Sequence, residues 1–115
     1  LQAALGQHAH LPPADVQACL CELSAWSIVR TLNAPTDKLV VCGGGVFNQA
    51  LMTRLAELLP DTPVVPSDSL GIPAMEVEAA AFAWLASQTV GGHASSLVQV
   101  TGACAPRILG AIYPA

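Results

Sequence analysis

The sequence has few charged residues and no cluster of basic ones. Its 115 residues include four Lys and Arg against eight Asp and Glu, which gives a net charge of −4, and only 10% of the chain is charged. Nucleic acids and anionic membrane surfaces are bound through Lys and Arg, so we expect neither as a partner. Soluble domains carry roughly 25% charged residues. The shortage predicts that part of the surface is covered by further polypeptide or by a partner subunit. We expect this chain, which begins with Leu1, to be part of a longer protein.

Long apolar runs and the common metal and nucleophile motifs are also missing. The longest unbroken apolar run, residues 79–86, is far shorter than the roughly 18 residues of a membrane span. The first ten residues lack the positive region of a signal peptide. The three histidines form no HxxxH or HExxH zinc motif, and no GxSxG nucleophile turn is present. No metal site is therefore expected from these residues, and any catalysis would fall to carboxylate and backbone groups.

The four cysteines form no CxxC pair. Cys19 and Cys21 would point roughly 200° apart on a helix, so they cannot bind one metal ion together. Because free cysteine is readily buried, we expect free, partly buried thiols in a reducing cytoplasm.

Hydrophobic patterning predicts helices that alternate with short strands. Residues 13–32, opened by proline, are expected to form a helix. Residues 38–42 are short, apolar and partly β-branched, which is typical of a buried strand. Asn48 is a plausible N-cap for a second helix that ends near residue 59.

The second half of the pattern repeats this order. A brief strand is expected from residue 64, and a third helix over residues 74–90, stopped by two glycines. Residues 1–12 are expected to be a weakly ordered lead-in, and the tail after residue 92 to be a loop with a short extended piece. The order predicts an α/β fold with a small parallel sheet packed with about three helices, and residues 1–115 as part of one lobe.

Three consecutive glycines, Gly43, Gly44 and Gly45, follow the first predicted strand. Ligands of open α/β sheets bind at the carboxyl ends of strands, and a backbone without Cβ atoms can lie against a nucleotide. The start of the next helix, near Asn48, would favour an anion. A second interpretation is that the glycines only make a tight turn and Asn48 only caps the helix. The pattern is neither GxGxxG nor GxxxxGK[ST], so spacing alone does not decide between them.

One carboxylate of the third predicted helix falls on its apolar side. At roughly 100° per residue, Glu78 lies among Met75, Ala81, Phe82 and Leu85, and we expect Phe82 and Trp84 to be core residues. An ionised carboxylate in apolar surroundings is costly unless paired. Glu78 is therefore a candidate acid, base or hydrogen-bond acceptor for a polar ligand. The alternative is that it pairs with Arg54, Arg30 or a segment outside these residues.

Three separated blocks carry a resemblance to a known family. "VCGGGVFNQALMTRLAELLP", "MEVEAAAFAWLA" and "VTGACAPRILGAIYP" resemble, in this order, the C-terminal part of bacterial anhydro-N-acetylmuramic acid kinases. The resemblance implies a ribonuclease-H-like lobe of the actin-like ATPase superfamily. It also implies a cytoplasmic enzyme of peptidoglycan recycling, with ATP and Mg²⁺ as cofactors, and a homodimer. The activity implied is phosphorylation of 1,6-anhydro-N-acetylmuramic acid at O6 with hydrolytic opening of the anhydro ring.

The same resemblance assigns roles to particular residues. It implies that Gly43, Gly44, Gly45 and Asn48 lie beside ATP, and that Glu78 faces the anhydrosugar and helps to hold the attacking water. The family's SGTSxDG phosphate-binding block and its main catalytic aspartate are absent from this sequence. Because phosphoryl transfer needs both sides of the nucleotide, we expect these 115 residues to be inactive without the N-terminal lobe.

Two other functions stay open at this point. The chain could belong to another sugar kinase or a carbamoyltransferase-like ATPase of the same superfamily. It could instead be a non-catalytic docking lobe, in which the glycines form only a turn.

Overall fold

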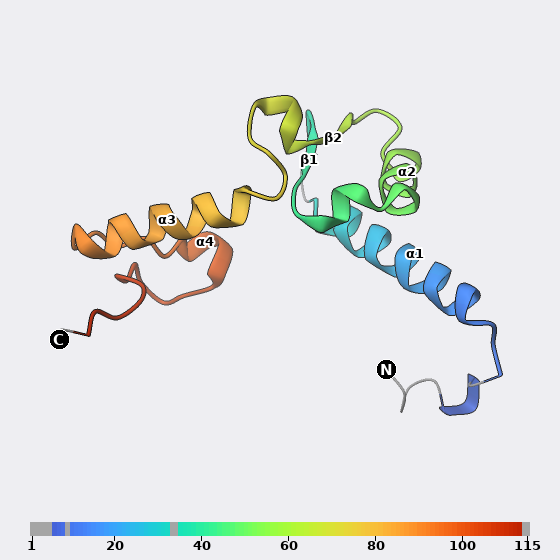
Figure 1. Ribbon diagram of the computed structural model, residues 1–115, viewed down its shortest axis with the longest axis horizontal. Helices are drawn as coiled ribbons and strands as arrows, with labels where there is room; N and C mark the ends of the chain where they lie inside the picture. The colour runs from blue at the N-terminus through green and yellow to red at the C-terminus, as the bar shows by residue number, and fades with distance from the viewer. Residues whose placement is uncertain (1–5, 9, 33–34, 114–115) are drawn as a thin grey trace. The chain divides into compact units, whose positions relative to one another are not determined.

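A computed structural model describes residues 6–8, 10–32 and 35–113 (Figure 1). These residues form two compact units, Leu1–Ala74 and Met75–Ala115.

The first unit contains the predicted helix–strand–helix–strand order. Its elements are 3₁₀ helix η1 (Gly6–His8), helix α1 (Pro13–Thr31), strand β1 (Leu39–Val41), 3₁₀ helix η2 (Gly44–Phe47), helix α2 (Gln49–Leu58), strand β2 (Val64–Pro66) and 3₁₀ helix η3 (Ser67–Leu70). The two helices and two strands are therefore confirmed, with Pro13 in the first turn of α1 as predicted. Of the expected lead-in, residues 1–5 and 9 lie outside the described residues.

Strands β1 and β2 pair in parallel, which confirms the predicted α/β class. Leu39 pairs with Val64 and Val41 with Pro66, so both strands end at the same edge. The segments that follow them, the glycines and η3, consequently begin side by side. This edge of the sheet is where ligands of parallel α/β sheets bind.

Helices α1 and α2 pack against each other and supply most of the buried core. Ala25 of α1 and Leu55 of α2 are almost completely buried. Arg54 joins the two helices on their exposed side, because its Nε and Nη2 donate to the Glu22 carboxylate at 2.6 and 2.9 Å. Its Nη1 also donates to Glu57 at 2.9 Å. Two hydrogen bonds from one guanidinium group to one carboxylate restrict the relative orientation of the two side chains more than a single bond would.

The second unit is built on helix α3 (Val77–Val90) and the short helix α4 (Val98–Thr101). After α4 the chain returns along the end of α3, where the Thr89 hydroxyl donates to the carbonyl of Leu109. The amide of Ser95 donates to the carbonyl of Arg107 at 3.0 Å. The third helix is therefore confirmed, three residues shorter at its start than predicted. The expected extended piece of the tail is wrong among the described residues, which contain α4 instead.

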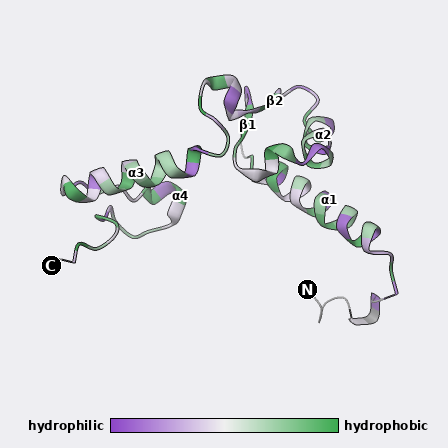
Figure 2. Cartoon of the chain, viewed as in Figure 1, coloured by the Kyte–Doolittle hydropathy of each residue, from purple (hydrophilic) through white to green (hydrophobic). Residues whose placement is uncertain are grey.

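Helix α3 is mostly hydrophobic along its length, as Figure 2 shows, and its polar residues lie mainly near its two ends. Phe82 and Trp84, two residues apart and thus on different sides, are 63% and 51% exposed. The prediction that Phe82 and Trp84 are core residues is therefore wrong within the described part of the chain, where α3 has no buried residue. A helical wheel identifies the apolar side of a helix but not what covers it. A helix with apolar residues on most of its sides is typical of the interior of a larger protein.

No helix within the described part of the chain has the length and apolar character needed to cross a bilayer.

Candidate functional site

The candidate site is the turn after β1, and Gly43 determines its shape. Gly43 has φ 73° and ψ −171°, a combination that is essentially restricted to glycine. Its carbonyl accepts a hydrogen bond from the amide of Val46 at 3.2 Å, which starts η2. At this position the tight-turn interpretation is sufficient, because the fold itself requires glycine.

Gly44 and Gly45 differ from Gly43, because the fold does not require glycine at either position. Neither has a positive φ. A Cβ at Gly44 would meet no atom beyond its chain neighbours within 4 Å, and one at Gly45 would meet only Leu51 Cδ2, at an ordinary 3.7 Å. Glycine in a helical turn costs roughly 0.5–1 kcal/mol relative to alanine. Two glycines without a structural need leave a bare stretch of backbone at the ligand-binding edge of the sheet.

Asn48 closes the turn and begins α2. Its side-chain oxygen accepts a hydrogen bond from the amide of Leu51 at 3.2 Å, so the predicted N-cap is confirmed. The structure thus places all four proposed nucleotide-binding residues in one turn between β1 and α2. The four residues are therefore close together in the fold. Their contact with a nucleotide stays a prediction.

Sequence analysis missed the loop that lies against this turn. The amide of Gly43 donates to the carbonyl of Ala74 at 2.8 Å. The amide of Ala74 in turn donates to Oδ2 of Asp68 at 3.2 Å. The sequence signal was an Asp followed three residues later by Gly71, a pattern typical of turns, but it did not indicate which segment the turn would contact.

Glu78 belongs to the second unit, in the first turn of α3. The expectation that it is surrounded by apolar side chains is wrong for these residues, because Glu78 is exposed and Met75 and Phe82 beside it are 62% and 63% exposed. Its alternative pairing with Arg54 or Arg30 stays a prediction, because these arginines belong to the first unit. Arg54 binds Glu22 and Glu57, and Arg30 lies 4.7 Å from the ring centroid of Trp26. Among the residues that the structure describes, Glu78 forms no ion pair.

The described residues do not by themselves supply a metal site. They include no group of three His, Cys, Asp or Glu side chains that could hold an ion. All four cysteines are free, as expected, but only Cys21 is partly buried, and Cys19, Cys42 and Cys104 are exposed.

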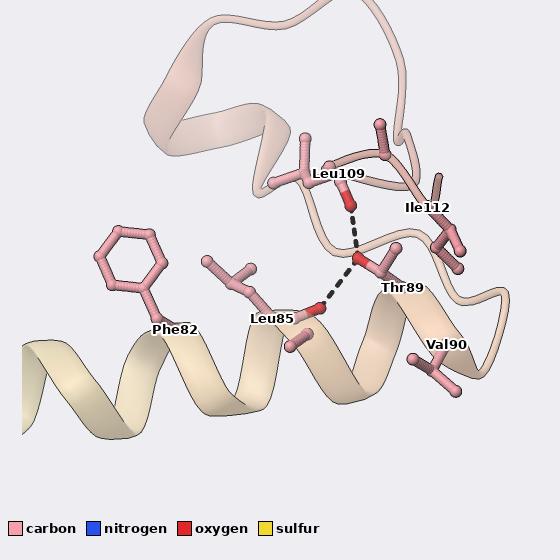
Figure 3. Close-up of a pocket in the computed structure, with 9 residues that line it drawn as sticks. Phe82, Leu85, Thr89, Val90, Leu109 and Ile112 are labelled. Carbon is pink, nitrogen blue, oxygen red and sulfur yellow. Dashed lines mark hydrogen bonds between the residues drawn. The ribbon is translucent and has the colours of Figure 1, made fainter. Parts of the chain in front are cut away.

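The second unit contains an apolar groove of about 490 Å³, shown in Figure 3. Its lining residues are Phe82, Leu85, Ala86, Thr89, Val90, Leu109, Gly110, Ala111 and Ile112. Thr89 is the only one with a polar side chain, and its hydroxyl is already used by the carbonyls of Leu85 and Leu109. Ligand pockets need some free polar groups to fix orientation, so the groove is a weak candidate for a nucleotide or sugar site.

Similar curated proteins are kinases: the chain is 50% identical over 114 residues to a kinase of Albidiferax ferrireducens and 55% over 106 residues to one of Ralstonia nicotianae. A third, from Pseudomonas paraeruginosa, is 48% identical over 118 residues. Each of the three is an anhydro-N-acetylmuramic acid kinase, and the family model of that description matches residues 1–115. The chain belongs to the anhydro-N-acetylmuramic acid kinase family, which confirms the resemblance found in the sequence.

The match covers nearly all of this chain but a smaller part of each relative. It spans 96%, 90% and 100% of the chain, and 29%, 28% and 32% of the respective relatives. The chain therefore corresponds to about 30% of the length of these curated relatives.

Proposed function

We propose that the turn formed by Gly43, Gly44, Gly45 and Asn48 is one wall of the ATP site of an anhydrosugar kinase. In the complete protein, the γ-phosphoryl group of ATP is transferred to O6 of 1,6-anhydro-N-acetylmuramic acid. Water adds to C1, the C1–O6 bond breaks, and a base accepts the proton of the water. The product is N-acetylmuramic acid 6-phosphate.

The observation that supports this function most is the pair Gly44 and Gly45. Neither glycine is explained by backbone conformation or by a crowded neighbour. Both lie at the carboxyl edge of a parallel sheet, where nucleotides bind in this class of fold. A nucleotide lying against the backbone accounts for their lack of side chains, because a Cβ at either position would occupy the space of the ligand.

The role of these residues is to bind and orient ATP, which supplies the phosphoryl group. The bare backbone of residues 44–45 provides the contact surface, and Asn48 fixes the start of α2 beside it. The Mg²⁺ that accompanies ATP would need ligands from the nucleotide and from other polypeptide, since the described residues include no suitable cluster. We expect the 115 residues alone to be inactive, because they would form only one side of the nucleotide site.

We assign Glu78 to the anhydrosugar, where its carboxylate would hold the attacking water as a hydrogen-bond acceptor. Its exposure and its lack of an ion pair among the described residues leave both oxygens available. The test is Glu78→Gln in the complete polypeptide. It should lower kcat by about 10²-fold or more, as loss of a positioned acid–base group typically does, with little change in KM for ATP. Exposed Glu76→Gln, two residues away, is the matched control, and unchanged turnover of Glu78→Gln would contradict this role.

The family resemblance also supports a cytoplasmic location and a homodimer for the complete protein. We propose no nucleic-acid or membrane partner, in keeping with the four basic residues of the sequence. Light scattering of the complete protein measures the oligomeric state directly.

A docking lobe without catalysis is the second candidate, and the exposed apolar surface of α3 favours it. A thermal melt of the complete polypeptide with and without ATP–Mg²⁺ and the anhydrosugar separates the two. A ligand at 100 times its Kd should stabilise the protein by about 2.7 kcal/mol. Stabilisation by both ligands is expected, and no shift with either would favour docking. A panel of other sugars distinguishes this kinase from another member of the superfamily.

A further inference from the structure

The loop that follows β2 is tied together by its own hydrogen bonds. Gly71, in a left-handed conformation at φ 82°, donates its amide to the carbonyl of Asp68 at 3.0 Å. Ile72 donates to the carbonyl of Ser67 at 3.3 Å. These bonds make a turn out of residues 67–72, so the Asp68 side chain has a defined position relative to the chain that leaves the turn.

From that position, the Asp68 carboxylate accepts a hydrogen bond from the backbone of Ala74. Its Oδ2 accepts the Ala74 amide at 3.2 Å, six residues further along the chain. Ala74 is only 4% exposed, so its backbone polar groups are largely screened from water. A screened amide without an acceptor costs roughly 1–3 kcal/mol, and a charged acceptor is stronger than a neutral one.

Ala74 then holds the glycine turn. Its carbonyl accepts the amide of Gly43 at 2.8 Å, which is a short and therefore favourable distance for an N–H···O bond. Gly43 is the residue whose unusual backbone angles direct the chain into Gly44 and Gly45. A connected path of two hydrogen bonds thus runs from the Asp68 carboxylate through Ala74 to the turn.

We propose that Asp68 is a positioning residue for nucleotide binding, which acts through Ala74 and Gly43 on the backbone of residues 43–45. This inference rests on the proposed ATP site. Asp68 itself does not touch the nucleotide. It fixes the wall against which the nucleotide lies, and its loss should weaken ATP binding more than sugar binding.

The test compares three variants of the complete polypeptide in steady-state kinetics. Asp68→Ala removes the acceptor and should raise KM for ATP about tenfold, the change that corresponds to one such hydrogen bond, while KM for the anhydrosugar stays within twofold. Asp68→Asn retains a side-chain oxygen at the same position and should restore most of the ATP affinity. Asp61→Ala removes another exposed carboxylate, from a different turn of the same unit, and should change neither KM.

A fourth variant, Gly44→Ala, separates this inference from the proposed function. If Gly44→Ala raises KM for ATP and Asp68→Ala does not, the ATP site stands and the role of Asp68 is refuted. If neither variant changes KM for ATP, the proposed ATP site itself is wrong. An equal rise of both KM values in Asp68→Ala, without recovery in Asp68→Asn, would mean general damage to the fold and would also overturn the role of Asp68. If Asp68→Ala does not fold, Asp68→Asn and Asp68→Glu replace it in the same experiment. Asp68→Glu displaces the carboxylate and should therefore raise KM for ATP but not KM for the anhydrosugar.

Discussion

The side-chain oxygen of Asn48 accepts a hydrogen bond from the backbone amide of Leu51, at 3.2 Å. This bond satisfies one of the amides that the first turn of α2 leaves without a partner. The side-chain nitrogen of Asn48 has no acceptor among the residues that the structure describes, and Asn48 is exposed. One residue can therefore cap the helix through its oxygen and still donate to a nucleotide through its nitrogen.

Substitutions of Asn48 separate these two roles. Asn48→Ala removes the cap and should destabilise the protein by about 1 kcal/mol in urea unfolding. Asn48→Asp keeps a capping oxygen, so stability should be retained, but it loses the donor and adds a negative charge beside the proposed site of the anionic nucleotide. ATP affinity, measured by calorimetry, should fall in Asn48→Asp. A protein with a normal cap and unchanged ATP affinity would limit Asn48 to its structural role.

Gly43→Ala should be destabilising without any steric clash. A Cβ at this position meets no atom beyond its chain neighbours within 4 Å, so the cost comes from backbone angles that are essentially restricted to glycine. Such conformations cost of the order of 1–3 kcal/mol in other residues. Gly44→Ala, which lies at an ordinary φ in open space, is the matched control and should be neutral or slightly stabilising. Equal stability of the two variants would mean that Gly43 does not hold this conformation.

The contact between Glu22 and Arg54 predicts a dependence of stability on acidic pH. The hydrogen bonds from Arg54 hold the pKa of Glu22 below its ordinary value, despite an opposing effect of desolvation. A carboxylate whose pKa is lowered in the folded state stabilises the fold above its unfolded pKa of about 4.3, and this contribution is lost as pH falls through the lower folded pKa. The stability advantage of wild type over Glu22→Gln in urea should therefore be present at pH 6 and decline below about pH 4.3.

Salt provides the control for that measurement. The two side chains are 48% and 38% exposed, so the interaction is screened by solvent and should be small. At about 1 M NaCl the difference between wild type and Glu22→Gln should largely disappear at every pH. A difference that grows as the pH falls would contradict the assigned direction of the pKa shift.

The exposed face of α3 makes a prediction about the complete polypeptide. If further chain covers Phe82, as the mostly hydrophobic character of α3 indicates, Phe82→Ala should destabilise the complete protein by about 3–5 kcal/mol. Substitutions of residues that remain exposed usually change stability by no more than about 0.5 kcal/mol. Val100→Ala, at a site 79% exposed outside α3, is a reference variant for the same urea experiment. A change within 0.5 kcal/mol for Phe82→Ala would show that α3 stays uncovered.

Local patterns were sufficient to predict the three longer helices and the two strands of this fold. The proline before α1, the Asn at the start of α2 and the glycines after α3 mark helix boundaries through interactions within a few residues, and each predicted helix is present. The four residues proposed to bind ATP could also be grouped from the sequence, because they are consecutive or nearly so and follow a strand.

What could not be predicted depends on contacts between distant residues or on polypeptide beyond these residues. Asp68 reaches Gly43 only through Ala74, a residue whose proximity follows from the parallel pairing of β1 and β2 rather than from any local pattern. Glu78 and Phe82 lie on the side of α3 that the helical periodicity predicts to be buried. Periodicity gives no information about what covers that side, and for these residues the assumed burial was wrong.

The central claim is that the bare backbone at Gly44 contacts ATP. The most direct test is to measure the affinity of the complete protein for ATP–Mg²⁺ in wild type and in Gly44→Ala, which adds a methyl group at that position. Because Gly44→Ala should leave the fold intact, any change in ATP affinity would come from a contact with the nucleotide and not from a loss of protein stability. We predict that calorimetry gives a Kd for ATP at least about tenfold weaker for Gly44→Ala than for wild type, with an unchanged melting temperature in the absence of ligand. An unchanged Kd would contradict the account, because it would show that the space beside Gly44 is not occupied by the nucleotide.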